Sequence, residues 1–231
     1  MVQEMTPVTV RLRFFKVGNL QYISHLDLVR TMNKVVTRAG LPLWYTEGFN
    51  PKPKMVFAAP LSIGTESLAE FMDLRLTEWV DPAHVANRMN ENLTDEMRVS
   101  EAYYPDSRLT DLKWLSYDIT IDTAGADDAL AAHCETLLAG EHVVSEKKGK
   151  DGEFRAVDIR PLIRTAKVTA EERRLRIFCI LSGDASAFLN PELLIRFLKK
   201  EAGILADPRL TDEGYRILRK EAYRWDMTPF R

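Results

Sequence analysis

Two dipeptides, Asp81-Pro82 and Asn190-Pro191, are the strongest structural signals in the chain. An Asp or Asn at the N-cap followed by proline favours a helix start, because the side chain accepts a backbone N–H and proline has none to leave unpaired. Apolar residues then recur at helical spacing, at Val85, Met89 and Leu93 and again at Leu194, Phe197 and Leu198. The two helix starts come at corresponding points of the two halves, which predicts a repeated order of elements.

The first half is predicted to run β-α-β-β-α-β. Val8, Val10, Leu12 and Phe14 alternate with polar residues, as in a half-buried strand. Ser24 with Asp27 resembles a capping box, and Gly40 ends the helix that follows. Further strands are predicted at 41–46, 55–60, 69–77 and 97–103. The strands at 41–46 and 55–60 flank the loop 47–54 and are counted together as one hairpin arm in this order.

The second half shows the same order without visible sequence identity. Strands are predicted at 115–121, 175–181 and 214–225, a hairpin over 142–159, and helices over 127–138 and from Asn190 to Gly203. A turn-rich segment between about Pro105 and Leu112 predicts domains at 1–108 and 109–231. The expected fold class is α+β, with two tandem ferredoxin-like (βαββαβ) units, antiparallel sheets and helices on one face. A single mixed sheet with helices on one side is the alternative.

Charge and cysteine content restrict the classes of function. The chain has 32 Lys and Arg against 34 Asp and Glu, so a polyanion site must be local. Cys134 and Cys179, the only two cysteines, fit reduced, buried thiols of a cytosolic protein. The N-terminus lacks the apolar region of a signal peptide, and no run of about 18 apolar residues occurs. We therefore expect a cytoplasmic protein with no membrane segment.

The segment Tyr45–Lys54 is the most unusual in the chain. Prolines at 51 and 53 favour an extended, polyproline-like loop that holds Lys52 and Lys54 as fixed cations. Tyr45 and Phe49 offer flat faces for bases, and Asn50 adds a polar contact, which together suit single-stranded RNA or a phosphate. The alternative is a rigid connector whose aromatic residues fill the core and whose lysines are only solvated.

Three arginines extend this candidate phosphate-binding set. Arg11 and Arg13 lie on the strand face opposite the apolar row, the face that binds RNA in the RRM, although the RRM's aromatic pair is missing there. The alternative is that these arginines pair with Asp73 across the sheet. Arg30 belongs to the outward basic face of the first helix. Arg160 follows Asp158, with which it forms an ion pair or a turn unless it extends a basic groove.

Motifs for catalysis are weak. His25, at the first helical position, with Tyr22 nearby, permits a metal-independent RNA cleavage site to be drawn, but a local hydrogen bond is the commoner role of such a histidine. No HxH, HExxH, CxxC, Walker, GxGxxG or GxSxG motif occurs. We therefore predict no catalytic residue beyond those two candidates, no metal and no cofactor.

Five runs carry a resemblance to a known family: Lys16–Asp27, Arg38–Leu43, Glu47–Lys54, Ala59–Ser67 and Val157–Leu162. Together they resemble the radical SAM-associated family DUF2344. The resemblance implies that the chain is the partner of a radical SAM protein, either fused to it or separate. It also implies an association with neighbouring proteins that handle RNA. Two isolated cysteines cannot hold a [4Fe–4S] cluster, so the radical chemistry would lie in the partner. Lys52 stands where the family's usual SQGFNPHPK form has a histidine.

The resulting hypothesis is a non-catalytic accessory module that works with a radical SAM enzyme and binds RNA or another phosphorylated substrate. Its binding residues would be Arg11, Arg13, Arg30, Tyr45, Phe49, Asn50, Lys52 and Lys54. The first alternative is a protein-interaction scaffold without RNA binding, which would show a large apolar patch and no basic cleft. The second alternative is a metal-independent RNA-processing enzyme that uses His25 and Tyr22.

Overall fold

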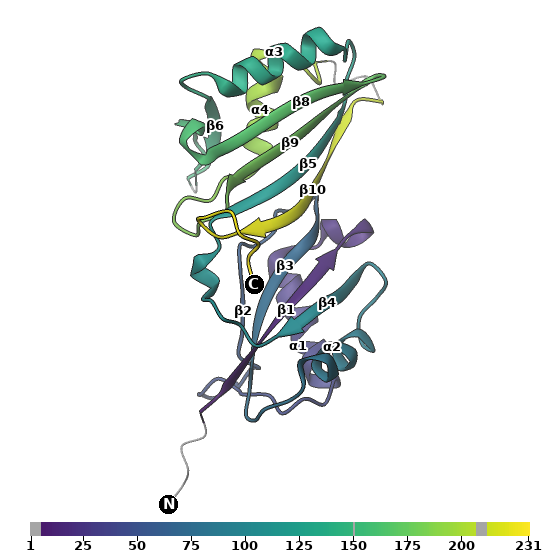
Figure 1. Ribbon diagram of the computed structural model, residues 1–231, viewed down its shortest axis with the longest axis vertical. Coiled ribbons are helices and arrows are strands. Elements are labelled where there is room, and N and C mark those ends of the chain that lie inside the picture. Colours follow the sequence, from purple (N-terminus) through teal and green to yellow (C-terminus); the bar gives the residue numbers. More distant parts are fainter. Residues whose placement is uncertain (1–5, 150, 207–211) are drawn as a thin grey trace, which may run out of the picture. The chain divides into compact units, whose positions relative to one another are not determined.

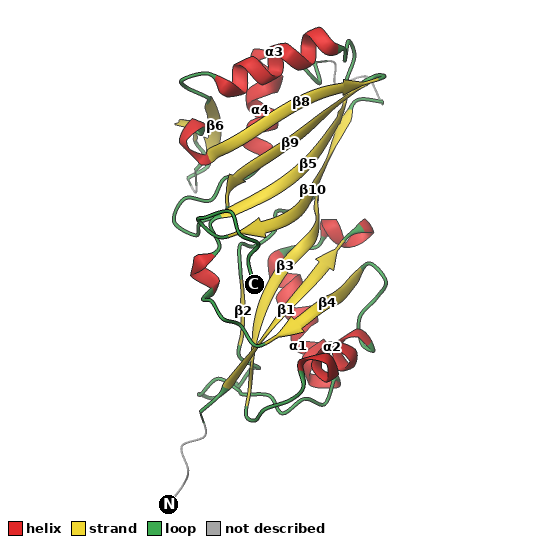
Figure 2. Ribbon diagram, viewed as in Figure 1, coloured by secondary structure: helices red, strands yellow, loops and turns green. Residues whose placement is uncertain are grey.

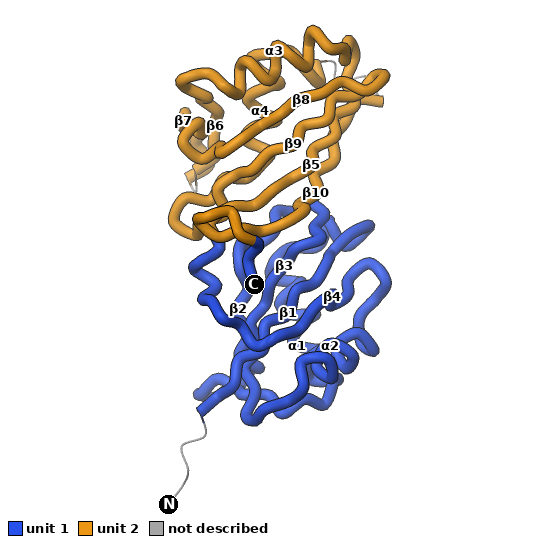
Figure 3. The backbone as a smooth tube through the Cα atoms, in the orientation of Figure 1, with its two compact units in different colours: residues 1–112, 229–231 blue, residues 113–228 orange. Residues whose placement is uncertain are grey.

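The computed structural model describes residues 6–149, 151–206 and 212–231, and the chain divides into two compact units (Figure 3). Unit 1 comprises residues 1–112 together with residues 229–231, and unit 2 comprises residues 113–228. The division therefore falls between Leu112 and Lys113, at the end of the turn-rich segment. No signal in the sequence indicated that the last three residues pack with unit 1.

Unit 1 follows the predicted order of elements. They are β1 (Val8–Lys16), α1 (His25–Arg38), β2 (Met55–Phe57), β3 (Thr65–Leu76), α2 (Pro82–Asn90) and β4 (Met97–Tyr103) (Figure 1). Both predicted helix caps are present: the Ser24 hydroxyl accepts the Asp27 N–H at 3.1 Å, and the Asp81 carboxylate accepts the Ala83 N–H at 3.0 Å. Capping of this kind satisfies N–H groups that have no partner within the helix.

The sheet of unit 1 has the strand order β4-β1-β3-β2, and each of these pairings is antiparallel. Alternate residues of β1 and β3 turn toward the helices, and Leu12, Met72 and Leu74 are completely buried. They pack with apolar residues of α1 and α2, among them Met32 and Val85. One apolar face of the sheet and the apolar stripes of two helices thus form the core.

Unit 2 contains β5 (Trp114–Asp122), α3 (Asp128–Ala139), β6 (Val144–Lys148), β7 (Phe154–Asp158), β8 (Ile163–Glu171), β9 (Arg174–Ser182), α4 (Glu192–Glu201) and β10 (Gly214–Tyr223). Its main sheet has the order β10-β5-β9-β8, again antiparallel throughout (Figure 2). β6 and β7 form a separate hairpin. The fold class is α+β, as predicted. Within the described residues, no helix is long and apolar enough to span a bilayer.

Three predicted details differ from the structure. The N-cap of α4 is Pro191 and not Asn190, although the Asn190 side chain still accepts the Glu192 N–H at 3.1 Å. The segment 41–46 is not a continuous strand: only Leu43, opposite Leu76, and Tyr45, opposite Pro53, make isolated bridges. Conversely, β8 was not predicted. It lies at one edge of the described sheet, and only Ile163 and Val168 are buried along it, so its apolar alternation is too sparse to signal a strand.

Candidate phosphate-binding hairpin

Residues 44–54 form a hairpin that projects from the edge of the unit 1 sheet. The Trp44 N–H donates to the Arg75 carbonyl at 2.9 Å, and the Arg75 N–H donates to the Lys54 carbonyl at 3.1 Å. Both ends of the hairpin are therefore bonded to the same residue of β3. Between these points, the Lys54 N–H donates to the Trp44 carbonyl and the Thr46 N–H to the Lys52 carbonyl, both at 2.8 Å. The predicted polyproline-like loop is therefore wrong, because its two arms are bonded to each other.

Pro53 fits this hairpin without the loss of a hydrogen bond. Pro53 lies opposite Tyr45, and the cross-arm donors are Thr46 and Lys54, so the missing N–H of Pro53 leaves no gap in the ladder. The Thr46 hydroxyl also accepts the Lys52 N–H at 3.1 Å and closes the tip. Sequence reasoning assigned Thr46 no role, since its partner six residues away depends on the register of the two arms.

The hairpin presents two rings and two cations to solvent. Phe49 at the tip has a relative exposure of 111%, and Tyr45 is 44% exposed. Asn50, Lys52 and Lys54 are also exposed, and within the described residues neither lysine has an ion-pair partner. The alternative in which Phe49 fills the core is therefore wrong, and the five predicted loop residues do lie together.

Arg11 is not part of this surface, and the expectation that it is exposed is wrong. Its side chain is completely buried and bonded to Asp73 at 2.6 Å, to the Ser107 hydroxyl at 2.9 Å and to the Arg231 carbonyl at 3.0 Å. The Phe230 ring covers it, with 4.8 Å between the guanidinium carbon and the ring centroid. The sheet face that would resemble an RNA-binding face is covered here by the chain's own C-terminal residues.

Arg13, two residues further along the same face, is half-buried. Its guanidinium carbon lies 5.9 Å from the centroid of the Phe71 ring, which is itself 1% exposed and packed edge-on against Phe230 at 5.0 Å. Arg13 therefore contributes to the packing of this covered face. We leave Arg11 and Arg13 out of the phosphate-binding set.

Arg30 lies on the exposed face of α1, as predicted, but it is already paired. Its guanidinium bonds to Asp27 at 3.0 Å, with both side chains more than half exposed. The Ser24 hydroxyl and then Arg30 lower the pKa of Asp27, because both bond to its charged form. An exposed pair of this kind breaks easily, so Arg30 can change partners at little cost.

His25 and Tyr22 are not assembled as a catalytic pair. The His25 ring packs edge-on against Phe57, with centroids 5.5 Å apart, and its buried Nδ1 has no hydrogen-bond partner among the described residues. Tyr22 is 66% exposed, and no hydrogen bond joins it to His25 in the described part of the chain. A general base needs such contact with the group that it activates, so the geometry gives the enzyme alternative no support.

Asp158 and Arg160 form a turn and do not extend a basic groove. One Asp158 oxygen accepts the Arg160 N–H at 3.0 Å, and the other lies 2.8 Å from His142 Nδ1. These bonds, with that of His142 the largest cause, lower the pKa of Asp158 to about 2. The Arg160 guanidinium donates to the carbonyls of Gly140 and Ile163 at 3.1 and 2.9 Å. Both side chains thus hold the chain between β7 and β8.

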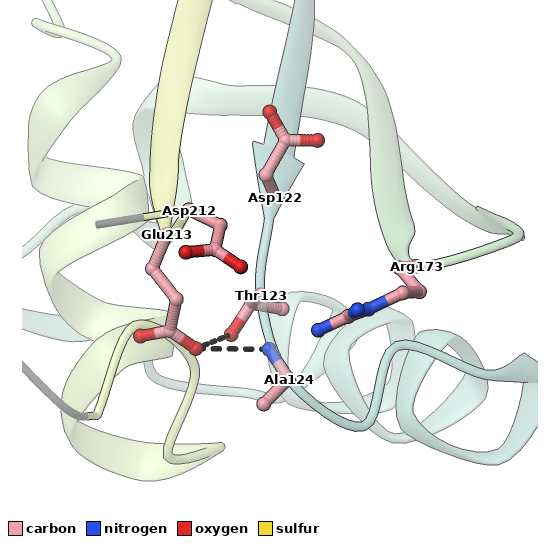
Figure 4. Close-up of a pocket in the computed structure, with 6 residues that line it drawn as sticks. All are labelled: Asp122, Thr123, Ala124, Arg173, Asp212 and Glu213. Atoms are coloured by element: carbon pink, nitrogen blue, oxygen red, sulfur yellow. Dashed lines mark hydrogen bonds between the residues drawn. The ribbon is translucent and has the colours of Figure 1, made fainter. Parts of the chain in front are cut away.

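A hollow of about 250 Å³ in unit 2 is acidic (Figure 4). The Thr123 hydroxyl and the Ala124 N–H both donate to one oxygen of Glu213, at 3.0 and 2.8 Å. Its lining residues are Asp122, Thr123, Ala124, Arg173, Asp212 and Glu213. Asp122 is paired with Arg174, and the remaining lining carries two carboxylates against the one guanidinium of Arg173, so this hollow does not favour phosphate.

The two cysteines are free, buried thiols, as predicted. Burial raises the pKa of both Cys134 and Cys179. Residues 6–149, 151–206 and 212–231 contain no group of three or more His, Cys, Asp or Glu that could hold a metal ion. The hairpin is therefore the surface on which most of the predicted binding residues converge.

Comparison with known proteins supports the family resemblance. A search of curated proteins finds no match. A chain in the crystal structure of a Cbf5-Nop10-Gar1 complex matches at 8% identity and a TM-score of 0.49, over 92% of this chain and 48% of that chain. This chain thus spans about half the length of that neighbour. The model of the family described as an uncharacterized protein conserved in bacteria, DUF2344, matches residues 9–191. The chain therefore belongs to the DUF2344 family.

Proposed function

We propose that this protein is a non-catalytic accessory module that binds RNA or another phosphorylated substrate through the hairpin 44–54 and works with a radical SAM enzyme. The radical SAM partnership is what the resemblance to the family implies. The phosphate binding is supported by the structure of the hairpin itself. In this arrangement the module would hold the substrate, and the radical SAM enzyme would carry out the reaction on it.

The observation that carries the proposal is the full exposure of Phe49 beside two cations without ion-pair partners in the described chain. Exposing a phenylalanine ring forgoes roughly 1.5–3 kcal/mol of burial free energy, which a purely structural loop would gain by turning the ring inward. A base stacked on that ring recovers this contact, while Lys52 and Lys54 attract the backbone phosphates.

The fold of each unit is the second part of the proposal. We propose that both units are ferredoxin-like. In unit 1, the order β1-α1-β2-β3-α2-β4 with the sheet order β4-β1-β3-β2 supports this assignment. Unit 2 repeats the order as β5, α3, β8, β9, α4 and β10, with β6 and β7 inserted as a hairpin.

Fluorescence anisotropy with a labelled single-stranded RNA of about 12 nucleotides, over a salt series, tests the binding. For single strands the logarithm of the affinity falls with the logarithm of salt by about 0.7 per phosphate contact, so Lys52→Ala/Lys54→Ala should flatten the slope by about 1.4. Phe49→Ala should weaken binding about 5- to 100-fold.

The matched control is Lys147→Ala/Lys148→Ala, which removes two exposed lysines from β6. It should retain the wild-type slope. Equal slopes for the hairpin variant and the control would contradict the proposal. Gel filtration of the chain with a radical SAM protein, scored by co-elution, tests the partnership separately.

A further inference from the structure

The unit 2 sheet has an open face as well as a core face. α4 crosses one side of this sheet, and no helix of the described residues lies over the other side of β9, β5 and β10 (Figure 1). Side chains alternate along β9: Leu175, Ile177, Cys179 and Leu181 are buried, and Arg174, Arg176, Phe178 and Ile180 point the opposite way. Unlike the corresponding face of unit 1, where Arg11 and Phe71 are buried, this face presents exposed side chains.

Phe178 lies in the middle of the open face and is 42% exposed. Its cross-strand neighbours are Lys167 on β8 and Asp118 on β5. A phenylalanine at this position has no core to fill, because the core of unit 2 lies on the other side of the sheet. Its accessible ring is therefore free to contact a ligand.

The open face carries a surplus of positive charge. Each of three acids is paired with a cation: Asp122 with Arg174 at 2.7 Å, Glu171 with Arg176 at 3.2 Å, and Asp118 with Lys220 at 3.5 Å. Lys167 and Arg216, which are exposed on the same face, have no ion-pair partner in the described part of the chain. Glu221, opposite Ser116, is a fourth acid on this face, against the five cations named here, so the surplus is cationic. Lys167 lies next to Phe178, and Arg216 lies two strands away on β10.

A second ring lies on the neighbouring strand. Trp114 begins β5, is half-buried, shares the open face by alternation and lies opposite Ser182, four residues along β9 from Phe178. That offset is about 14 Å along the sheet. The Arg164 guanidinium carbon lies 5.3 Å from the Trp114 ring centroid, so this ring also has a cation beside it.

We propose that the open face of unit 2 binds single-stranded RNA, with bases stacked on Phe178 and Trp114 and phosphates held by Lys167, Arg164 and Arg216. The RRM, a four-stranded sheet whose aromatic residues stack two or three bases, binds single-stranded RNA in this way. An acidic peptide would use the cations but leave the rings in water. The inference deepens the proposed function and rests on it, since it names RNA among the phosphorylated ligands.

The test measures binding of a labelled 12-nucleotide single-stranded RNA, and of an abasic oligomer of equal length, to the full chain. Phe178→Ala should weaken RNA binding about 5- to 100-fold and leave the abasic oligomer unaffected, because only bases stack. Phe178→Trp should retain binding. The matched control is Phe154→Ala, which removes a 57% exposed ring from the separate β6–β7 hairpin and should bind as wild type does.

The outcomes separate this inference from the proposed function. Wild-type binding that Lys52→Ala/Lys54→Ala weakens and Phe178→Ala does not would overturn the inference and retain the hairpin site. Equal losses of RNA and abasic oligomer in Phe178→Ala would also overturn it, because stacking would not be the contact. No RNA binding by wild type at low salt would overturn the inference and exclude RNA as the ligand of the hairpin. Unfolding temperatures close to that of wild type establish that the variants are folded.

Discussion

Arg11 and Asp73 face each other across β1 and β3 and are joined by two hydrogen bonds, Nε to Oδ1 at 2.6 Å and Nη2 to Oδ2 at 2.9 Å. The guanidinium is completely buried and the carboxylate side chain is only 15% exposed. The remaining donors of Arg11 reach Ser107 and Arg231. This pair therefore ties two strands, the segment after β4 and the C-terminal residues together within unit 1.

Removing one member of this pair should destabilise the fold strongly. Arg11→Met leaves the Asp73 carboxylate without its counter-charge, and breaking a buried pair in this way costs about 3–5 kcal/mol. Urea unfolding followed by circular dichroism measures the loss. Arg98→Ala, which breaks an exposed pair with Asp95, is the control and should change stability by no more than about 0.5 kcal/mol. A similar small change for Arg11→Met would show that the buried pair adds nothing.

Gly18→Ala should also destabilise unit 1. Gly18 has φ +62°, where an L residue costs roughly 1–2 kcal/mol, and an added Cβ would clash with a Glu96 oxygen. That oxygen accepts the Asn19 N–H at 3.0 Å, so it cannot move away without losing a bond. Gly203→Ala, at φ +71° with nothing within 4 Å of the added Cβ, should lose only the free energy of the unfavourable backbone conformation. The urea midpoint should fall further for Gly18→Ala, and equal midpoints would contradict the clash.

Asp158 should make stability depend on acid pH. Its folded pKa of about 2 lies below its ordinary value of 3.8, chiefly because of the bond to His142. Its contribution is therefore complete above pH 4 and is lost as the pH falls toward 2. Unfolding temperatures of wild type and Asp158→Asn across that range should converge as the pH falls. Profiles that stay parallel would mean that this carboxylate has no part in the loss.

Neither cysteine should react with a thiol reagent in the folded protein. Cys134 and Cys179 are completely buried, and burial raises the pKa of each, so little thiolate forms at pH 8. Ellman's reagent should label neither residue under native conditions and both of the chain's two cysteines in denaturant. Labelling of one thiol without denaturant would show that part of the sheet or of α3 opens locally.

The sequence alone determined the features that depend on local pattern. The alternation from Val8 to Phe14 predicted β1, and the caps at Ser24 and Asp81 predicted the starts of two helices, because capping and periodicity involve residues close in the chain. The same locality explains why the candidate residues Tyr45, Phe49, Asn50, Lys52 and Lys54 were found as one segment and lie on one hairpin.

Only the tertiary structure decided which side chains of the two sheets meet solvent. Arg11 and Phe178 both lie opposite a core row, yet Arg11 is buried under Phe230 and Phe178 is exposed. Alternation identifies the face that turns away from the core, but not whether a distant segment returns to cover it. For Arg11 the covering residues come from 220 positions away, a separation that no local pattern records.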